Sequence, residues 1–277
     1  MKNKILIFIL LTIFCLPIRS QNIFDDISFS RSIKLIEKGK LTKALKKIED
    51  NLDKGNDILR NNYALSLIYS DREFKDYNTE TSYLFLKNSF VEYTSILDEK
   101  TIEKLNKTPI NDSIYNLKFT KICKLALEDA LSINSIDNYN HYLKFYNKTS
   151  EENRILIIKK RNIVAFNIAV ISHTIDSYKY FIETYPQSIQ IDKAWEQIYT
   201  IAFDDATKTN TVGSYREHID NYPSSPHIYS CTLKIHEISF TKAEQTHTSD
   251  GYYQFCQEFP NSIQYTNSYN LYEDRQF

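Results

Sequence analysis

Glycine and proline are scarce in this chain, with 4 and 6 among 277 residues. Because these residues interrupt helices, their scarcity is typical of long helices joined by short turns. The strict alternation of apolar and polar residues that indicates a strand is also lacking. These absences predict an all-α fold.

Long apolar runs are absent except at the N-terminus, where residues 5–18 follow Met1-Lys2-Asn3-Lys4. A basic start and an apolar run shorter than the roughly 18 residues that span a bilayer are typical of a secretory signal peptide. We expect residues 1–20 to be this signal, with cleavage between Ser20 and Gln21. Retention as an N-terminal anchor is the alternative. Lipidation of Cys15 is disfavoured because the bulky Phe14 precedes it.

An excess of positive charge is lacking as well. Removing residues 1–20 takes away Lys2, Lys4 and Arg19, so 34 basic residues become 31 against 35 acidic ones, a formal charge of −4. No basic patch is interleaved with aromatic residues, as binding to phosphates and bases requires. We therefore expect no nucleic-acid partner.

Cysteine is also sparse. The expected mature chain holds Cys123, Cys231 and Cys256, an odd number scattered through helical patterns, which is not a disulfide framework. We expect these residues to act as small buried apolar side chains. A Cys231–Cys256 bridge is the alternative.

Motifs for catalysis and metal binding are missing. The histidines form no HExxH pattern, and the chain holds no Gly-rich phosphate loop and no nucleophile elbow. The paired carboxylates Glu151-Glu152 and Asp204-Asp205 have the spacing of solvated helix faces. We therefore expect no catalytic residue, no cofactor and no metal site. An enzyme whose site is built from scattered residues is the alternative.

What the chain does have is an internal repeat. The phrase Tyr185-Pro186-Gln187-Ser188 returns 37 residues later as Tyr222-Pro223-Ser224-Ser225 and, after the same interval, as Phe259-Pro260-Asn261-Ser262. A degenerate copy lies 39 residues upstream of the first. Such a period marks a solenoid, in which each unit buries its apolar face against its neighbours. Three positions recur in every copy: Leu127, Phe166, Phe203 and Phe240; Ala130, Ala169, Ala206 and Ala243; Tyr139, Tyr178, Tyr215 and Tyr252.

Each copy is predicted to be a pair of helices. The long helix is expected to begin directly after the phrase, with Ser188, Ser225 and Ser262 as N-caps, and in the copy before with Thr149, which Glu152 completes to a capping box. In the copy after Ser188 it should run to about Thr209. The short helix should begin after Thr174, Thr211 or Thr248 and end before the proline.

The N-terminal half is predicted to be helical too. After a short lead-in at residues 21–29, a helix from Ser30 should end at Gly39, where a left-handed cap is needed before the next helix. Further helices are expected from about Asp57 to Ser70, with Tyr63, Leu67 and Ile68 on one face, from Thr79 to Leu97, and from Asp98 to Asn106, closed by Pro109.

With the joint at Gly39–Leu45 and the phrase A-x(8)-Y-x(6)-[YF]-P-x-S, the chain resembles tetratricopeptide-repeat (TPR) proteins. It is most similar to the TPR-like envelope proteins of Bacteroidetes-type bacteria, in which a segment like Tyr77–Tyr83 precedes such repeats. The resemblance covers residues 30–277: a degenerate TPR-like region at 30–108 and TPR-like repeats at 109–277. It implies an α/α superhelical solenoid that acts by holding partners.

The chain departs from that family in its period and its joints. The repeat is 37 residues long instead of 34, an excess of about one helical turn. The later joints use Thr caps in place of glycine, and the peptide-carboxylate clamp of standard TPR units has no assignable counterpart, so the partner-binding residues are unknown. Phe277 falls 37 residues after Phe240, inside the long helix of a further copy. Residues 273–276 supply the polarity of a capping unit; a shortened gene is the alternative.

Three sets of residues could carry recognition. The recurring tyrosines are expected to fill one buried slot per copy, although an exposed ladder of phenols could grip a peptide or a glycan. His218 takes the slot of Phe181 and Phe255 and is expected in or near the core, whereas His173 and His247 should lie in loops. The better candidates for recognition are the positions that vary between copies: His141, Tyr180, Glu217 and Gln254.

Together these features predict an exported, non-enzymatic TPR-like scaffold for protein–protein interaction in the bacterial cell envelope, in the periplasm or at the periplasmic face of the outer membrane. A groove of the solenoid would hold an extended or helical segment of a protein partner. The alternative is a module that binds envelope glycan or peptidoglycan through exposed tyrosines.

Overall fold

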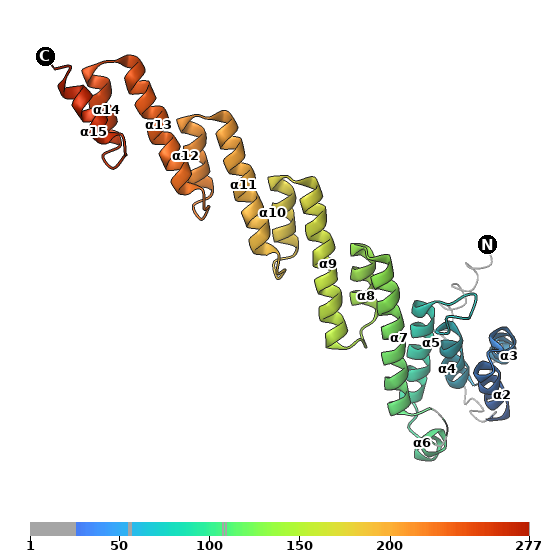
Figure 1. Cartoon of the computed structure of the whole chain (residues 1–277). Coiled ribbons are helices and arrows are strands. Elements are labelled where there is room, and N and C mark those ends of the chain that lie inside the picture. Colours follow the sequence, from blue (N-terminus) through green and yellow to red (C-terminus); the bar gives the residue numbers. More distant parts are fainter. Residues whose placement is uncertain (1–25, 55–56, 107, 109, 277) are drawn as a thin grey trace. The chain divides into compact units, whose positions relative to one another are not determined.

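The computed structural model describes residues 26–54, 57–106, 108 and 110–276. Over these residues the chain forms fourteen helices and no strand, which confirms the all-α prediction. It divides into two compact units, one ending at Ile158 and one beginning at Lys159. Within each unit, helices pack against their neighbours in the chain (Figure 1). The expected signal at residues 1–20, Pro109 and Phe277 lie outside the described residues.

The first unit contains seven complete helices. They are α2 (Asp26–Glu37), α3 (Leu41–Asp53), α4 (Ile58–Tyr69), α5 (Thr79–Thr94), α6 (Glu99–Asn106), α7 (Asp112–Ile133) and α8 (Ile136–Phe145). Helix α4 is the centre of this unit, since it packs against α2, α3 and α5. Its burial therefore extends beyond the predicted face and includes Arg60, Asn61 and Ser66.

Two predicted helix limits in this unit are wrong, and one is confirmed. Helix α2 begins at Asp26, not Ser30, because Phe29 is buried with its ring centroid 6.4 Å from that of Tyr63 on α4. The helix predicted to run from Thr79 to Leu97 ends at Thr94, and Leu97 is exposed. At the first joint the prediction is confirmed, since Gly39 has a φ of 66°.

The boundary between the units falls inside α9 (Glu151–Ser172). The second unit continues with α10 (Ile175–Thr184), α11 (Ile191–Thr209), α12 (Val212–Asn221), α13 (Ile228–Thr246), α14 (Ser249–Glu258) and α15 (Tyr265–Glu273). Here α11 and α13 have 19 residues each, whereas α10, α12 and α14 have 10. Long and short helices therefore alternate, as the repeat predicts.

The joint from a long helix to the next short one is the same in each copy. The residue after the long helix adopts left-handed geometry, with φ between 48° and 53° at Asn134, His173, Asn210 and His247. The next residue caps the short helix: the hydroxyl groups of Thr174 and Thr211 accept from backbone N–H groups at 3.1 Å. The predicted caps of the short helices are confirmed.

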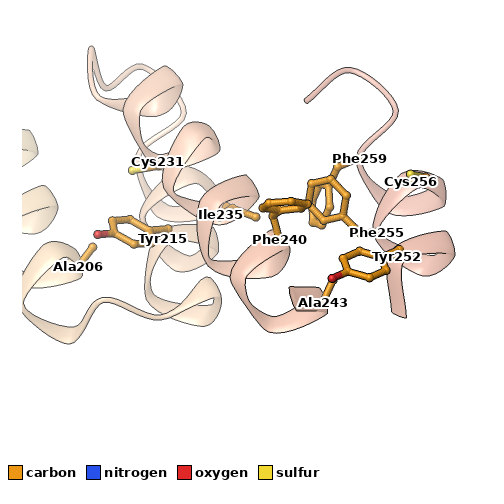
Figure 2. Close-up of a cluster of buried hydrophobic side chains, with 10 residues drawn as sticks. All are labelled: Ala206, Tyr215, Cys231, Ile235, Phe240, Ala243, Tyr252, Phe255, Cys256 and Phe259. Carbon is orange, nitrogen blue, oxygen red and sulfur yellow. The ribbon is translucent and has the colours of Figure 1, made fainter. Parts of the chain in front are cut away.

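The recurring tyrosines belong to this joint. Tyr139, Tyr178, Tyr215 and Tyr252 are each at most 1% exposed. The hydroxyl of Tyr215 donates to Oδ1 of the left-handed Asn210 at 3.1 Å, and Tyr139 donates to Asn134 at 2.6 Å. In Figure 2, Tyr215 lies beside Ala206, and Tyr252 lies beside Ala243 one repeat later. The interpretation as a buried slot is confirmed, so these four side chains are not an exposed ladder.

The predicted caps of the long helices are wrong. Helices α11 and α13 begin three residues after Ser188 and Ser225, whose hydroxyl oxygens instead accept from the N–H two residues further on, at 3.3 and 3.1 Å. The serines therefore hold a turn that precedes the helix. Thr149 is paired with the Tyr142 hydroxyl at 2.5 Å, and the neighbouring Ser150 caps α9 through the N–H of Asn153.

Candidate functional site

Two adjoining cavities, of about 450 and 220 Å³, open on the second unit. The first lies between the joint that precedes α10 and the C-terminal half of α11, and the second lies between α11 and α12. Ile175 and Asp205 line both cavities. We call the combined surface the acidic groove; its lining includes Asp176, Asp204, Asp205, Lys208 and Glu217, together with Ile175, Ile201, Ala202, Ala206 and His218.

Helix periodicity explains how α11 forms one wall. Ile201, Asp204, Asp205 and Lys208 are spaced i, i+3, i+4 and i+7, and positions with this spacing share one face of a helix. Ala202 and Ala206 lie towards α12, where their small side chains leave room for the second cavity. The floor is therefore apolar, and the rim is charged.

The rim carries more negative than positive charge. Four carboxylates face a single lysine, and all five side chains are exposed. Lys208 Nζ lies 2.9 Å from Asp205 Oδ1, and this contact raises the pKa of Lys208. Among the described residues, Asp176, Asp204 and Glu217 have no ion pair. The charge of Asp204 also raises the pKa of Lys208, so one lysine interacts with both aspartates. The excess of negative charge that is left in the groove attracts cationic groups.

His218 borders the second cavity from the core side. Its side chain is 3% exposed, and Nε2 lies 2.9 Å from the Ser225 hydroxyl. Nδ1 has no hydrogen-bond partner in good geometry, although the Ala202 carbonyl is near enough to oppose part of the pKa shift. Burial lowers the pKa of His218, so its neutral form is favoured. The predicted core position is confirmed; the cavity beside it was not predicted.

The charge of the acidic groove does not recur one repeat further on. The positions 37 residues further on from Asp176, Asp204, Asp205 and Glu217 hold Gly213, Thr241, Lys242 and Gln254. The tyrosine slot, by contrast, recurs unchanged in both copies. In a repeat protein, core positions that stay the same while surface positions change between copies are typical of a surface that recognises a specific partner.

The structure brings only one of the predicted recognition positions to the groove. Glu217 lines it, whereas Tyr180 and Gln254 are exposed elsewhere on the second unit. His141 is also exposed, with Nε2 3.1 Å from Glu80 in the first unit. The Asp204-Asp205 pair was interpreted as ordinary helix-surface charge. Both residues are exposed as expected, but sequence reasoning missed the cavity that they line. The sequence did hold one sign of this site: the next copy has Thr241 and Lys242 in place of Asp204 and Asp205.

The described residues contain no cluster of metal ligands, and their cysteines are buried. No group of three or more His, Cys, Asp or Glu side chains is placed there to hold a metal ion. Cys123, Cys231 and Cys256 are buried and free, so the alternative Cys231–Cys256 bridge is not formed. Burial raises the pKa of Cys123 to about 12 and also raises that of Cys231, which disfavours the nucleophilic thiolate.

The described helices include none that is both long and apolar enough to span a bilayer. In comparisons with known proteins, neither a protein-family model nor a curated protein matches the chain.

Proposed function

We propose that this chain is a non-enzymatic, TPR-like scaffold that binds protein partners in the bacterial cell envelope, after export directed by residues 1–20. The observation that carries the proposal is the acidic groove. It is an open surface between neighbouring helix pairs, with an apolar floor and a charged rim whose four acids are absent from the equivalent positions one repeat further on. The envelope location rests on the signal-like start of the chain and on its resemblance to TPR-like envelope proteins.

The groove suits a segment of polypeptide. Peptide grooves on helical proteins obtain affinity from apolar anchors and specificity from a few polar groups. Ile175 and Ile201 are half-buried and lie at the first cavity, where they offer apolar contact. Their neighbours Asp176 and Asp204 offer acceptors at the rim.

Crosslinking in cells tests the proposal. A photoreactive amino acid replaces Glu217, which lines the groove, and in a control variant it replaces Glu244, an exposed residue of α13 outside the groove. We expect a defined envelope protein to be captured from position 217 and not from position 244. Fractionation of the same cells should recover the chain with the periplasm or the outer membrane.

Binding to envelope glycan is the competing outcome. The four recurring tyrosines are buried and cannot serve it, but Tyr180 and Tyr229 are 68% and 71% exposed. Retention of the purified chain on cell-wall material, together with no protein captured from position 217, would contradict the scaffold proposal. Loss of that retention in a Tyr180→Ala, Tyr229→Ala variant would assign it to these side chains.

A further inference from the structure

We infer that the acidic groove binds a basic segment of the partner, in which lysine or arginine side chains alternate with apolar ones. This inference rests on the proposed function and specifies the partner's chemistry. Three kinds of observation support it: the excess of carboxylates over cations on the rim, the form of the cavity, and a buried histidine beside it.

The carboxylates that form no ion pair come from three helices around the two adjoining cavities. Asp176 lies in the first turn of α10, Asp204 on α11 and Glu217 on α12. Lys208 is the one cation of the lining, and Asp205 already pairs with it at 2.9 Å. A guanidinium or ammonium group placed between the helices would meet acceptors from several directions, and charge-assisted hydrogen bonds of this kind are stronger than neutral ones.

The form of the groove favours a long basic side chain over a small cation. A bare metal ion needs several close ligands, and the described residues provide no such group. Lysine and arginine carry an apolar stem, which packs on apolar surface while the charged head reaches polar groups. Ile175 and Ile201 provide that surface next to Asp176 and Asp204, in a cavity of about 450 Å³.

His218 adds a buried polar side chain beside the second cavity. The side chain is 97% buried, it lines the second cavity, and its Nδ1 lacks a partner in good geometry. Buried polar groups without a partner are uncommon and need an explanation. The nearby Ala202 carbonyl meets part of that need, so His218 marks a polar edge of the cavity.

The next repeat provides an internal comparison. Its equivalent positions hold no acid at the four rim sites and carry Lys242 where the acidic groove has Asp205. A basic segment should therefore be attracted to the groove between α10, α11 and α12 and repelled from the surface one repeat further on. The inference thus specifies a single site, located by charge within an otherwise repeated fold.

Fluorescence anisotropy with synthetic peptides tests the inference on the full chain. One labelled probe alternates lysine and arginine with leucine, and its counterpart has glutamate at every basic position. We expect the basic probe alone to bind, and to bind more weakly at about 0.5 M salt, where screening shortens the range of electrostatic attraction.

Neutral variants locate the binding site. The groove variant combines Asp176→Asn, Asp204→Asn and Glu217→Gln. The control variant combines Asp192→Asn, Glu244→Gln and Asp250→Asn, which are exposed outside the groove and change the net charge equally. We expect the groove variant to raise the Kd of the basic probe about tenfold, because three weak, exposed ion pairs are lost together. The control variant should stay within about twofold of the original chain.

Several results would overturn the inference. Equal binding of the basic and acidic probes would do so, as would equal weakening in the groove and control variants. Circular dichroism checks folding, and Asp204→Asn alone replaces the triple variant if the latter unfolds. A protein captured in cells from position 217 through a segment without basic residues would contradict this inference and leave the scaffold proposal standing, whereas the absence of any captured protein would contradict the proposal itself.

Discussion

His218 occupies the position that Phe181 and Phe255 hold one repeat before and one repeat after it. The three side chains are 3%, 1% and 4% exposed, and each packs against the recurring phenylalanine of its own copy at centroid distances of 5.9, 5.3 and 5.4 Å. A ring of similar size therefore fills the slot in every copy. The imidazole differs in polarity, and the Ser225 hydroxyl compensates by pairing with Nε2.

The histidine at position 218, where neighbouring copies have phenylalanine, should make the stability of the second unit sensitive to acid. Burial lowers the pKa of His218 and of His236 below the ordinary value of 6.5. Below pH 6.5 the unfolded chain then binds more protons than the folded chain, so the free energy of unfolding falls as pH decreases. The expected slope approaches about 1.4 kcal/mol per pH unit for each histidine that stays neutral when folded.

Urea unfolding followed by the fluorescence of Trp195, the single tryptophan, measures this slope because Trp195 lies on α11 of the second unit. His218→Phe should reduce the slope. His173→Asn should leave it unchanged, because His173 is exposed and an asparagine stands at the equivalent Asn210. Equal slopes in the original chain and in His218→Phe would show that His218 does not cause the acid sensitivity.

At the scale of the helix and its joints, left-handed residues end the long helices in two ways. The first joint of the chain uses Gly39, whose φ is 66° and which has no side chain to strain. The other joints use asparagine or histidine and gain a contact with the buried tyrosine, such as the 3.1 Å hydrogen bond from Tyr215 to Asn210. The side chain thus offsets part of the cost of the left-handed backbone.

Two glycine substitutions should therefore have opposite effects. Gly39→Ala should lower the free energy of unfolding by about 1 kcal/mol through backbone strain alone, because an added Cβ would meet no atom within 4 Å. Gly213→Ala should raise it by about 0.5 kcal/mol, because Gly213 lies in the first turn of α12 and the nearest atom to its Cβ would be 3.9 Å away. Thermal unfolding by circular dichroism measures both, and a stabilising Gly39→Ala would refute the strain argument.

The sequence predicted the first residues of the short helices correctly, but not those of the long helices. The short helices begin where the Thr caps place them, because a cap depends only on the residues of the first turn. The long helices begin two residues later than the serine caps predicted, because Ser188 and Ser225 first close a turn, in which the Ser188 N–H donates to the Tyr185 carbonyl at 2.9 Å.

At the scale of the whole molecule, the core of the first unit is rich in aromatic side chains that can ionise. The first unit buries a dense group of tyrosine and phenylalanine rings, in which Tyr63 and Tyr115 lie 5.9 Å apart in edge-to-face contact. Burial raises the pKa of Tyr63 and of Tyr83 to about 12, and raises that of Tyr115 and Tyr146 as well. These phenols must stay neutral while the unit is folded.

The free energy of unfolding of the first unit should therefore fall steeply at alkaline pH. Its tyrosines lose a proton near pH 10 when unfolded but only at higher pH when folded, so their stabilising contribution is complete below pH 10 and is lost as pH rises towards 12. Tyrosinate absorbance should appear cooperatively, together with the loss of helical circular dichroism. Tyr63→Phe should shift this transition to higher pH. Gradual ionisation with the helices intact would contradict the expectation.

The sequence by itself determined the all-α class, the 37-residue alternation of long and short helices and the buried tyrosine slot, because each follows from local periodicity, capping and proline chemistry. The tertiary structure alone decided that α4 is buried around its circumference and that Asp176, Asp204 and Glu217, from three different helices, line one groove. Burial and proximity across helices arise from packing between distant segments. A groove with an apolar floor and an acidic rim is therefore a property of the folded chain, although the sequence shows that its four acids do not recur in the next copy.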